Sequence, residues 1–494
     1  MPKSVTTAHG LDSRRLAEGL LRVAPKNPAG LHAWLRTVCN LNIPRRSMCP
    51  GHVSPFAYLC ESFFGQSDLL VWANRGGGKT TLAAVACLLD ALFKRPVKSA
   101  VLAGSFDQSD RLVNCLRQLL TPHEALLHPR WLRDRLWLDG SSVLSLAQSQ
   151  QAVRGLRVQK LRCDEVDLFD RDVWRAAQFV TQSSGQTRGS LEVFSTLHRP
   201  GGLMDDLVTD AMVPPGRAGQ DEGPGALAGF RLMRWCLWEV IERCPCERKC
   251  RGCPLHADCA GRARKAEGFF RIDDAIAIKS RASRAAWESE MLCQRPRGEG
   301  LVFDEFRREL HVLPAPYRAD WPVYRAIDFG YSNPLVCLWV QVSPGGLVQV
   351  IDEYTQQRRA IDAHGQEMLA RERRHGYRPA LATYVDPAGH AHEVASGQAC
   401  TELLSAAGIP CTSCRSALGD GLELIRQHLA PAQGPPRLII DPHCEGLIRS
   451  FETYRYTPNT GRPAKDGPDH AIDALRYFFV NRMAPQLEVK RKRY

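Results

Sequence analysis

The chain has 494 residues, of which 65 are Lys or Arg and 53 are Asp or Glu, so its formal net charge is +12. Apolar residues make up 44% and charged residues 24%, near globular averages, which excludes disorder as a description of the whole chain. We expect neither a secretory signal nor a membrane helix, because no apolar run is long enough, and the positive charge favours a polyanionic partner such as nucleic acid.

Residues 1–60 are predicted to form a helical lead-in, and strands and helices alternate after it. Helix-forming stretches separate most of the expected strands, and such an alternation favours a mostly parallel α/β sheet. A Pro- and Gly-rich loop is expected at 214–229. The expected strands are Ser67–Ala73, Ala100–Gly104, Ser142–Ala147, Val158–Cys163 and Ser190–Thr196.

A glycine-rich segment, ANRGGGKT at 73–80, follows the first expected strand and precedes a helix. It matches the pattern G-x-x-x-x-G-K-[ST], except that Ala73 replaces the first glycine. In such a loop, backbone N–H groups surround phosphate oxygens, the lysine bridges the β- and γ-phosphates, and the hydroxyl holds Mg²⁺. The predicted nucleotide-binding residues are Arg75, Gly76, Gly77, Gly78, Lys79, Thr80 and Thr81.

An acidic pair follows the fourth expected strand. Asp164 is predicted to bind Mg²⁺ through water, and Glu165 to polarise the water that attacks the γ-phosphate. Gln159, Lys160 and Arg162 make this strand more polar than such strands usually are. An acidic strand end without a chemical role is the alternative.

Three further residues belong to the same predicted site, and Arg75 is a candidate for a second role in it. Ser195 and Thr196 close the next strand, where their hydroxyls could sense the γ-phosphate or simply cap the strand end. Arg75 and Arg154 are both candidates for an arginine that neutralises transition-state charge, and the sequence does not choose between them.

A cysteine-rich segment occupies residues 236–300. Five thiols lie within sixteen residues, and in a reducing compartment such a cluster indicates a metal site. We expect structural Zn²⁺ on Cys250, Cys253, Cys259 and Cys293, although an iron–sulfur cluster also fits. Alternative ligands are Cys244, Cys246 and His256. The basic flanks could touch DNA phosphates or form a solvated rim; they are Arg243, Arg248, Lys249, Arg251, Arg262, Arg264 and Lys265.

A second α/β pattern begins near residue 322. VYRAIDFG, LVCLWVQV and LVQVIDEY predict three antiparallel strands joined by short turns. They are followed by a helix, the strand ALATYVDP, another helix, the strand RLIID and a last helix around DHAIDALRY.

Acidic residues stand at the ends of these elements. Asp328 and Asp386 end two strands, and Asp473 lies on the last helix with His470 one turn earlier. Carboxylates placed in this way can meet at a sheet edge. There, two divalent cations roughly 4 Å apart, Mg²⁺ or Mn²⁺, would activate a water against a phosphodiester.

Three other acids are rival ligands for this site. They stand at neighbouring strand ends, where they could equally be solvated: Asp352, Glu353 and Asp441.

Taken together, the chain resembles the large terminase subunit of tailed bacteriophages from about residue 50 to 480. NRGGGKT, the Asp-Glu pair, the Ser-Thr step, DFGYSNP, VIDEY, VDP and DHAIDALRY occur in the family's order. The resemblance implies an additional-strand P-loop ATPase at 61–235, a Cys-rich metal-binding insertion at 236–300, an RNase H-like nuclease at 318–481 and a basic tail at 482–494.

It also implies roles for these residues. ATP and Mg²⁺ would bind at Lys79 and Thr80, with Asp164 as metal acid and Glu165 as catalytic acid/base. Ser195 and Thr196 would couple hydrolysis to movement. The nuclease ions would lie on Asp328, Asp386 and Asp473, with His470 accessory.

The implied function is a motor that drives double-stranded DNA into a procapsid and cuts concatemers. The implied partners are the portal protein, the small terminase subunit and further copies in a pentameric ring, in the host cytoplasm and not in the mature virion. Two alternatives are a nucleic-acid-dependent ATPase of the helicase or remodelling type with a non-cleaving DNA-binding C-terminal domain, and a zinc-stapled DNA adaptor with a vestigial P-loop.

Overall fold

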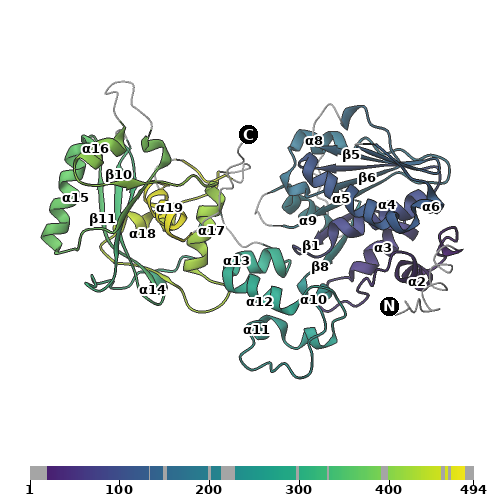
Figure 1. Cartoon of the computed structure of the whole chain (residues 1–494), viewed down its shortest axis with the longest axis horizontal. Helices are drawn as coiled ribbons and strands as arrows, with labels where there is room; N and C mark the ends of the chain where they lie inside the picture. Colours follow the sequence, from purple (N-terminus) through teal and green to yellow (C-terminus); the bar gives the residue numbers. More distant parts are fainter. Residues whose placement is uncertain are drawn as a thin grey trace, which may run out of the picture. The chain divides into compact units, whose positions relative to one another are not determined.

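The computed structural model describes residues 19–132, 134–147, 153–197, 202–212, 229–295, 300–330, 333–390, 399–457, 462–465 and 469–483. The chain divides into two compact units, Met1–Ala277 with Glu288–Pro296, and Ile278–Trp287 with Arg297–Tyr494 (Figure 1). The predicted basic tail lies almost wholly outside the described residues, as does most of the Pro- and Gly-rich loop. No helix in the described part of the chain is long and apolar enough to cross a bilayer.

The first unit is built on an eight-stranded sheet in the order β3-β4-β5-β2-β6-β7-β1-β8. All neighbours pair in parallel except β3 with β4 and β4 with β5. The strands are β1 (Asp68–Ala73), β2 (Lys98–Ala103), β3 (Arg130–Trp131), β4 (Arg135–Leu138), β5 (Ser141–Ala147), β6 (Lys160–Asp164), β7 (Ser190–Ser195) and β8 (Phe230–Trp235).

Strand β7 lies between β1, which leads into the glycine-rich loop, and β6, which ends in the acidic pair. This is the additional-strand arrangement, so the predicted α/β fold of the unit is confirmed. Strands β3, β4 and β8 were not predicted. The helices are α2 (Pro28–Val38), α3 (Pro55–Phe64), α4 (Lys79–Phe93), α5 (Phe106–Leu120), α6 (Glu124–Leu127), α8 (Arg171–Ala177), α9 (Leu203–Met212), α10 (Leu237–Val240) and α11 (His256–Cys259).

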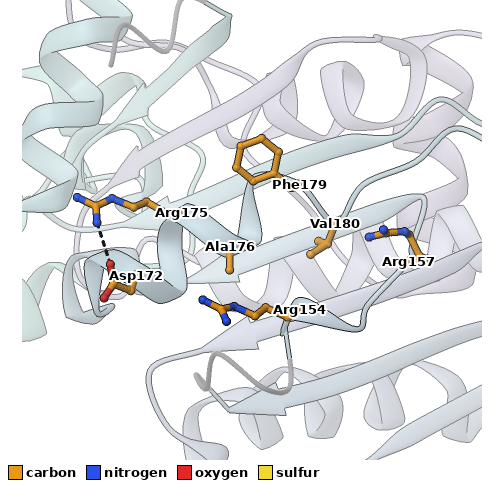
Figure 2. Close-up of a pocket in the computed structure, with 7 residues that line it drawn as sticks. All are labelled: Arg154, Arg157, Asp172, Arg175, Ala176, Phe179 and Val180. Carbon is orange, nitrogen blue, oxygen red and sulfur yellow. Dashed lines mark hydrogen bonds and ion pairs between the residues drawn. The ribbon is translucent and has the colours of Figure 1, made fainter. Parts of the chain in front are cut away.

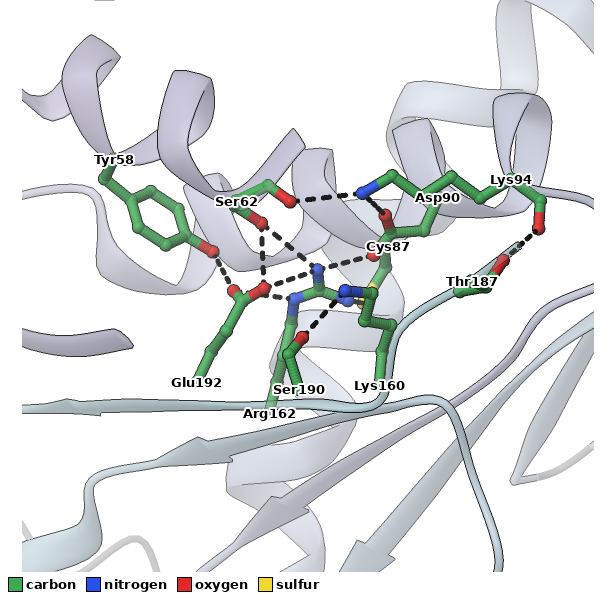
Figure 3. Close-up of polar contacts among 10 residues, drawn as sticks. All are labelled: Tyr58, Ser62, Cys87, Asp90, Lys94, Lys160, Arg162, Thr187, Ser190 and Glu192. Carbon is green, nitrogen blue, oxygen red and sulfur yellow. Dashed lines mark hydrogen bonds and ion pairs between the residues drawn. The ribbon is translucent and has the colours of Figure 1, made fainter. Parts of the chain in front are cut away.

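The polar character of β6 has a structural explanation. All five residues of this strand are buried, and Arg162 lies among the side chains of Asp90 on α4 and Glu192 on β7 (Figure 3). Lys160 donates to Ser190 Oγ at 2.7 Å. Buried charges are tolerated where they are paired, so the strand stays in the sheet interior.

The second unit contains a six-stranded sheet in the order β13-β12-β9-β10-β11-β14. As predicted, β9 (Val323–Asp328), β10 (Leu335–Val342) and β11 (Val348–Gln356) form an antiparallel meander. Strand β12 (Ala382–Val385) joins β9 in parallel, with β13 (Cys411–Thr412) beyond it and β14 (Leu438–Ile440) parallel to β11. This order is RNase H-like and confirms the predicted fold.

Helices cover both faces of this sheet. The core on one face includes α17 (Leu418–Leu429), α18 (Glu445–Thr453) and α19 (Asp469–Met483), and the core on the other includes α15 (Ile361–His375) and α16 (Cys400–Ala406). Helix α12 (Ile272–Arg281), helix α13 (Arg284–Ala286) and a π-turn (Trp287–Met291) follow one another along the chain. Helix α14 (Arg308–His311) precedes the meander.

Candidate active sites

The glycine-rich loop joins β1 to α4. Gly76 and Gly78 have positive φ angles of 71° and 83°, and a Cβ on Gly77 would lie 2.8 Å from the carbonyl oxygen of Asn74. The loop therefore needs these glycines. Ala73, in contrast, is the last residue of β1 and pairs with Trp235, so its extended backbone does not require glycine.

The lysine of this loop is buried, with 7% of its surface exposed. Its Nζ donates to the carbonyl oxygens of Ala73 and Asn74, both at 3.3 Å, and lies 3.7 Å from Glu165 Oε1. Lys79 is thus held at the mouth of the loop together with the acid predicted to act on water.

The predicted metal acid lies beside the start of α4. Thr80 Oγ1 donates to Asp164 Oδ2 at 3.2 Å, whereas Asp164 Oδ1 is buried without a hydrogen-bond partner. Burial, together with the negative charge of Glu165, raises the pKa of Asp164 to about 6. A buried carboxylate oxygen that lacks a partner, next to a hydroxyl, is a donor set that suits Mg²⁺.

The Ser-Thr pair closes the strand next to this acid. Ser195 is fully buried and its Oγ accepts a hydrogen bond from the backbone N–H of Asp167 at 3.4 Å, in the turn after Glu165. Thr196 is buried as well. Ser195 therefore contacts the turn that follows Glu165, which suits both the cap and the coupling role.

The two candidates for the arginine that neutralises transition-state charge lie in different surroundings. Arg75 is exposed and its backbone N–H donates to the carbonyl oxygen of Glu290 at 2.8 Å. Arg154 lines an open cavity of about 560 Å³ with two further arginines, Arg157 and Arg175, and with Phe179, which is 79% exposed (Figure 2).

In the second unit, three aspartates far apart in sequence line one cavity of about 730 Å³. Asp328 ends β9, Asp386 follows β12 and Asp473 projects from α19. His470 Nδ1 lies 2.9 Å from Asp328 Oδ2. Burial, with the negative charges of Asp473 and Asp386, raises the pKa of Asp328 to about 6. The structure thus brings together all four predicted nuclease residues.

The rival acids lie elsewhere in the second unit. Asp352 accepts two hydrogen bonds from Arg371, at 2.6 and 2.7 Å, and Glu353 accepts one from the backbone N–H of Leu447. Asp441 bonds the N–H of Ala315. None of the three is among the residues that line the cavity of Asp328, Asp386 and Asp473.

Sequence reasoning overlooked Arg476, which lines the same cavity. Its Nε donates to Asp473 Oδ1 at 2.8 Å. The signal was present, since the two residues are three apart on the last predicted helix and therefore share a face. Lys465 and Tyr477 also line the cavity.

The cysteine-rich segment forms a small cavity of about 30 Å³ in the first unit. Four thiols and His256 line it, and the thiols are those of Cys244, Cys250, Cys253 and Cys259. Two donors point at sulfur: the N–H of Ala263 at 3.5 Å from Cys259 Sγ, and Arg264 at 3.6 Å from Cys250 Sγ.

Two predicted ligands fall outside that cavity. Cys246 is exposed, and Cys293 is buried, with its Sγ donating to the carbonyl oxygen of Trp235 at 3.1 Å. The fourth cysteine of the cavity is therefore Cys244, and not Cys293 as predicted from the sequence. The physical reason is that residues 288–295 return to the first unit, where Glu290 accepts a hydrogen bond from the glycine-rich loop. Of the basic flank, Arg248 pairs with Asp273, and Arg264 supports a thiol.

The chain is similar to known large terminases. Residues 71–309 match the family described as terminase large subunit, T4likevirus-type, N-terminal. Among solved structures, the large terminase of a thermophilic bacteriophage is 14% identical, covering 84% of this chain and 94% of that chain with a TM-score of 0.48. The HK97 bacteriophage large terminase is 13% identical, covering 91% and 98%, with a TM-score of 0.36.

The P22 large terminase nuclease domain is 18% identical, covering 37% of this chain and 93% of that chain, with a TM-score of 0.32. No curated protein sequence matches the chain.

Proposed function

We propose that this chain, which belongs to the large terminase subunits of tailed bacteriophages, hydrolyses ATP to drive double-stranded DNA into a procapsid and cuts concatemeric DNA with a two-metal site. The family match spans residues 71–309, which include the glycine-rich loop. The observation that carries the cutting half of the proposal is the meeting of Asp328, Asp386 and Asp473 in one cavity, since a motor that only pulls has no need of it.

The chemistry of that cavity suits divalent cations. Three carboxylates line it, and carboxylate oxygens are the ligands that Mg²⁺ and Mn²⁺ prefer. Two divalent cations, Mg²⁺ or Mn²⁺, would activate a water and stabilise the leaving oxygen. His470 orients Asp328, Arg476 orients Asp473, and Lys465 supplies positive charge to a phosphate backbone.

The ATPase half rests on the loop and the acids beside it. Lys79 supplies a positive charge beneath the phosphates, and Glu165, 3.7 Å from it, is placed to polarise the attacking water. Mg²⁺ held by Thr80 and Asp164 would neutralise charge on the transferred phosphate. Ser195, bonded to the turn after Glu165, would pass the nucleotide state to the rest of the unit.

Structural Zn²⁺ belongs to the proposal as well. Cys244, Cys250, Cys253 and Cys259 line one cavity, and four thiolates bind zinc tetrahedrally. From the family, we propose that the chain works with the portal protein and the small terminase subunit, and that its copies form a pentameric ring.

The test compares two single substitutions in the full chain, each of which should abolish one activity and leave the other. We expect Asp328→Asn to abolish Mn²⁺-dependent plasmid cutting while DNA-stimulated ATP hydrolysis continues. We expect Lys79→Ala to abolish hydrolysis while cutting continues. ATP hydrolysis by the wild-type chain without cutting at any Mg²⁺ or Mn²⁺ concentration would instead favour the helicase-like alternative.

A second experiment separates the arginines. Arg154→Ala is expected to lower ATP hydrolysis by about 10³-fold or more if it acts as the arginine finger. Arg157→Ala, in the same cavity, is the matched control and should retain near-normal hydrolysis. A large loss with Arg75→Ala and none with Arg154→Ala would assign the role to Arg75.

A further inference from the structure

A second set of potential metal ligands lies in the first unit, away from the cysteine-rich segment. Cys49 and His52 come from the lead-in before α3, and Cys236 and Glu239 from the start of α10. The two pairs are 187 residues apart, yet one donor atom from each of the four residues lies within 4.8 Å of all the others. We propose that these four residues bind a zinc ion that fastens the lead-in to the ATPase unit.

The spacing of the sulfurs agrees with this proposal. Cys49 Sγ and Cys236 Sγ are 3.8 Å apart. Two ligands of a tetrahedral Zn²⁺ with bonds of about 2.3 Å are separated by about 3.8 Å, whereas disulfide sulfurs are only about 2.05 Å apart. Two touching thiols would give a similar separation, so the distinguishing observation is that a histidine and a carboxylate meet at the same point.

The surroundings of Glu239 favour a cation there. Its side chain is fully buried, and that of His52 is 5% exposed. Glu239 Oε1 accepts the backbone N–H groups of Met48 and Cys49, at 2.9 and 2.8 Å. Its Oε2 accepts the N–H of Cys236 at 2.8 Å and lies 3.0 Å from His52 Nδ1.

The carboxylate therefore fixes both cysteine backbones and the imidazole in one arrangement. One donor atom of Glu239 and one of His52 lie within 4.8 Å of both thiol sulfurs, so the carboxylate and the imidazole can each supply one ligand. Cysteine, histidine and carboxylate together form a donor set that Zn²⁺ accepts, and their negative charges would be buried at less cost around a divalent ion.

The four residues lie next to segments that contact the glycine-rich loop. Cys236 follows Trp235, whose Nε1 donates to the carbonyl oxygen of Gly77 in the glycine-rich loop at 3.0 Å. The N–H of Val53, next to His52, donates to the carbonyl oxygen of Arg234 at 2.8 Å. A zinc ion here would hold the edge strand β8 and the lead-in together, directly behind the phosphate-binding loop.

The experiment measures zinc in the full chain, purified under reducing conditions and dialysed against excess Mg²⁺ so that the nuclease carboxylates carry no zinc. We expect Cys49→Ser to lose one zinc equivalent per chain and to lower the melting temperature of the first unit. Cys60→Ser, a partly buried thiol on α3, is the matched control and should lose none. The double variant Cys250→Ser/Cys253→Ser should keep this equivalent even if it loses another, which separates the two sites.

A second measurement covers the case in which Cys49→Ser does not fold, because it uses the wild-type chain and the double variant instead. We expect Co²⁺ to replace zinc with sulfur-to-cobalt charge-transfer absorption that persists in Cys250→Ser/Cys253→Ser. Zinc content unchanged by Cys49→Ser would overturn the proposal. So would absence of the cobalt signal in the double variant, or a Cys49–Cys236 disulfide-linked peptide in the chain as purified.

Discussion

Two strands, one in each unit, end in the acids of the candidate sites, and each carries a buried arginine. In β6, Arg162 Nη2 lies 2.6 Å from Asp90 Oδ2 and 3.0 Å from Glu192 Oε1 (Figure 3). In β9, Arg325 pairs through two nitrogens with one acid, Glu372 on α15, at 2.5 and 2.7 Å.

The two arginines differ in the face on which they lie. Side chains alternate along a strand, so Arg162, two residues before Asp164, shares its face. Both face α4, since Asp164 meets Thr80 and Arg162 meets Asp90 on that helix. Arg325 is three residues before Asp328 and lies on the opposite face, which packs against α15, whereas Asp328 meets His470 on α19.

Two similar buried ion pairs therefore differ in whether they also position the residues of a candidate site. The pair on β6 ties the acid-bearing strand to the helix that begins at Lys79, so it supports both stability and the spacing of Thr80 and Asp164. The pair on β9 joins that strand to α15, and Arg325 also donates to Thr383 Oγ1 on β12 at 3.1 Å. Both contacts lie on the face of the sheet away from Asp328.

The largest effect is expected for Arg162→Met, because it removes the cation that two buried acids share. Asp90 then keeps only Lys94, at 2.9 Å, and Glu192 keeps only hydrogen bonds from the hydroxyls of Tyr58 and Ser62. Removal of one partner from a buried ion pair costs about 3–5 kcal/mol, so the melting temperature of the first unit should fall by roughly 10 °C in calorimetry. ATP hydrolysis per folded molecule should fall as well, since Asp164 shares the face. Hydrolysis that stays normal in the folded fraction would refute the link between the pair and the nucleotide site.

A slightly smaller effect is expected for Arg325→Met, which leaves only Glu372 unpaired, and Glu372 still accepts a hydrogen bond from Trp339 Nε1 at 2.8 Å. We expect a loss of about 3 kcal/mol in the second unit. Plasmid cutting per folded molecule should not change. Reduced cutting with intact circular dichroism would contradict the assignment of Arg325 to the face away from the acids.

The same comparison predicts a pH dependence. Burial would raise the pKa of Asp90, but the charges of Arg162, Lys94 and Lys160 outweigh it and hold this pKa below its ordinary value. The folded state then binds fewer protons than the unfolded state, so Asp90 stabilises fully above about pH 4 and loses this contribution as the pH falls below it. Calorimetry from pH 3 to 6 should show a flatter decline for Asp90→Asn than for the wild type.

The sequence predicted more of the site residues than of their supports. The strand ends at Asp164, Asp328 and Asp386 were predictable, because hydrophobic runs and turn signals locate strands. The pairing of Arg162 with Asp90 was not, since 72 residues separate them and only the packing of α4 on the sheet joins them.

Strand β4 and the two edge strands, β3 and β8, were missed for a related reason. Strands β3 and β4 are short and β8 is only partly buried, so the hydrophobic pattern that reveals a central strand is weak there. The Cys49-x-x-His52 and Cys236-x-x-Glu239 spacings were visible in the sequence, but nothing local indicated that the two pairs meet.

The smallest effect is expected when one hydrogen bond to the β6 ion pair is removed. Tyr58 on α3 donates to Glu192 Oε2 at 2.5 Å, while Glu192 also accepts from Ser62 at 2.8 Å and from Arg162. Tyr58→Phe therefore removes one of several hydrogen bonds and leaves every charge paired, at an expected cost of about 1–2 kcal/mol and with ATP hydrolysis unchanged. If Tyr58→Phe instead lowered hydrolysis as Arg162→Met is expected to, the whole network, and not the arginine on the acid's face, would control the site.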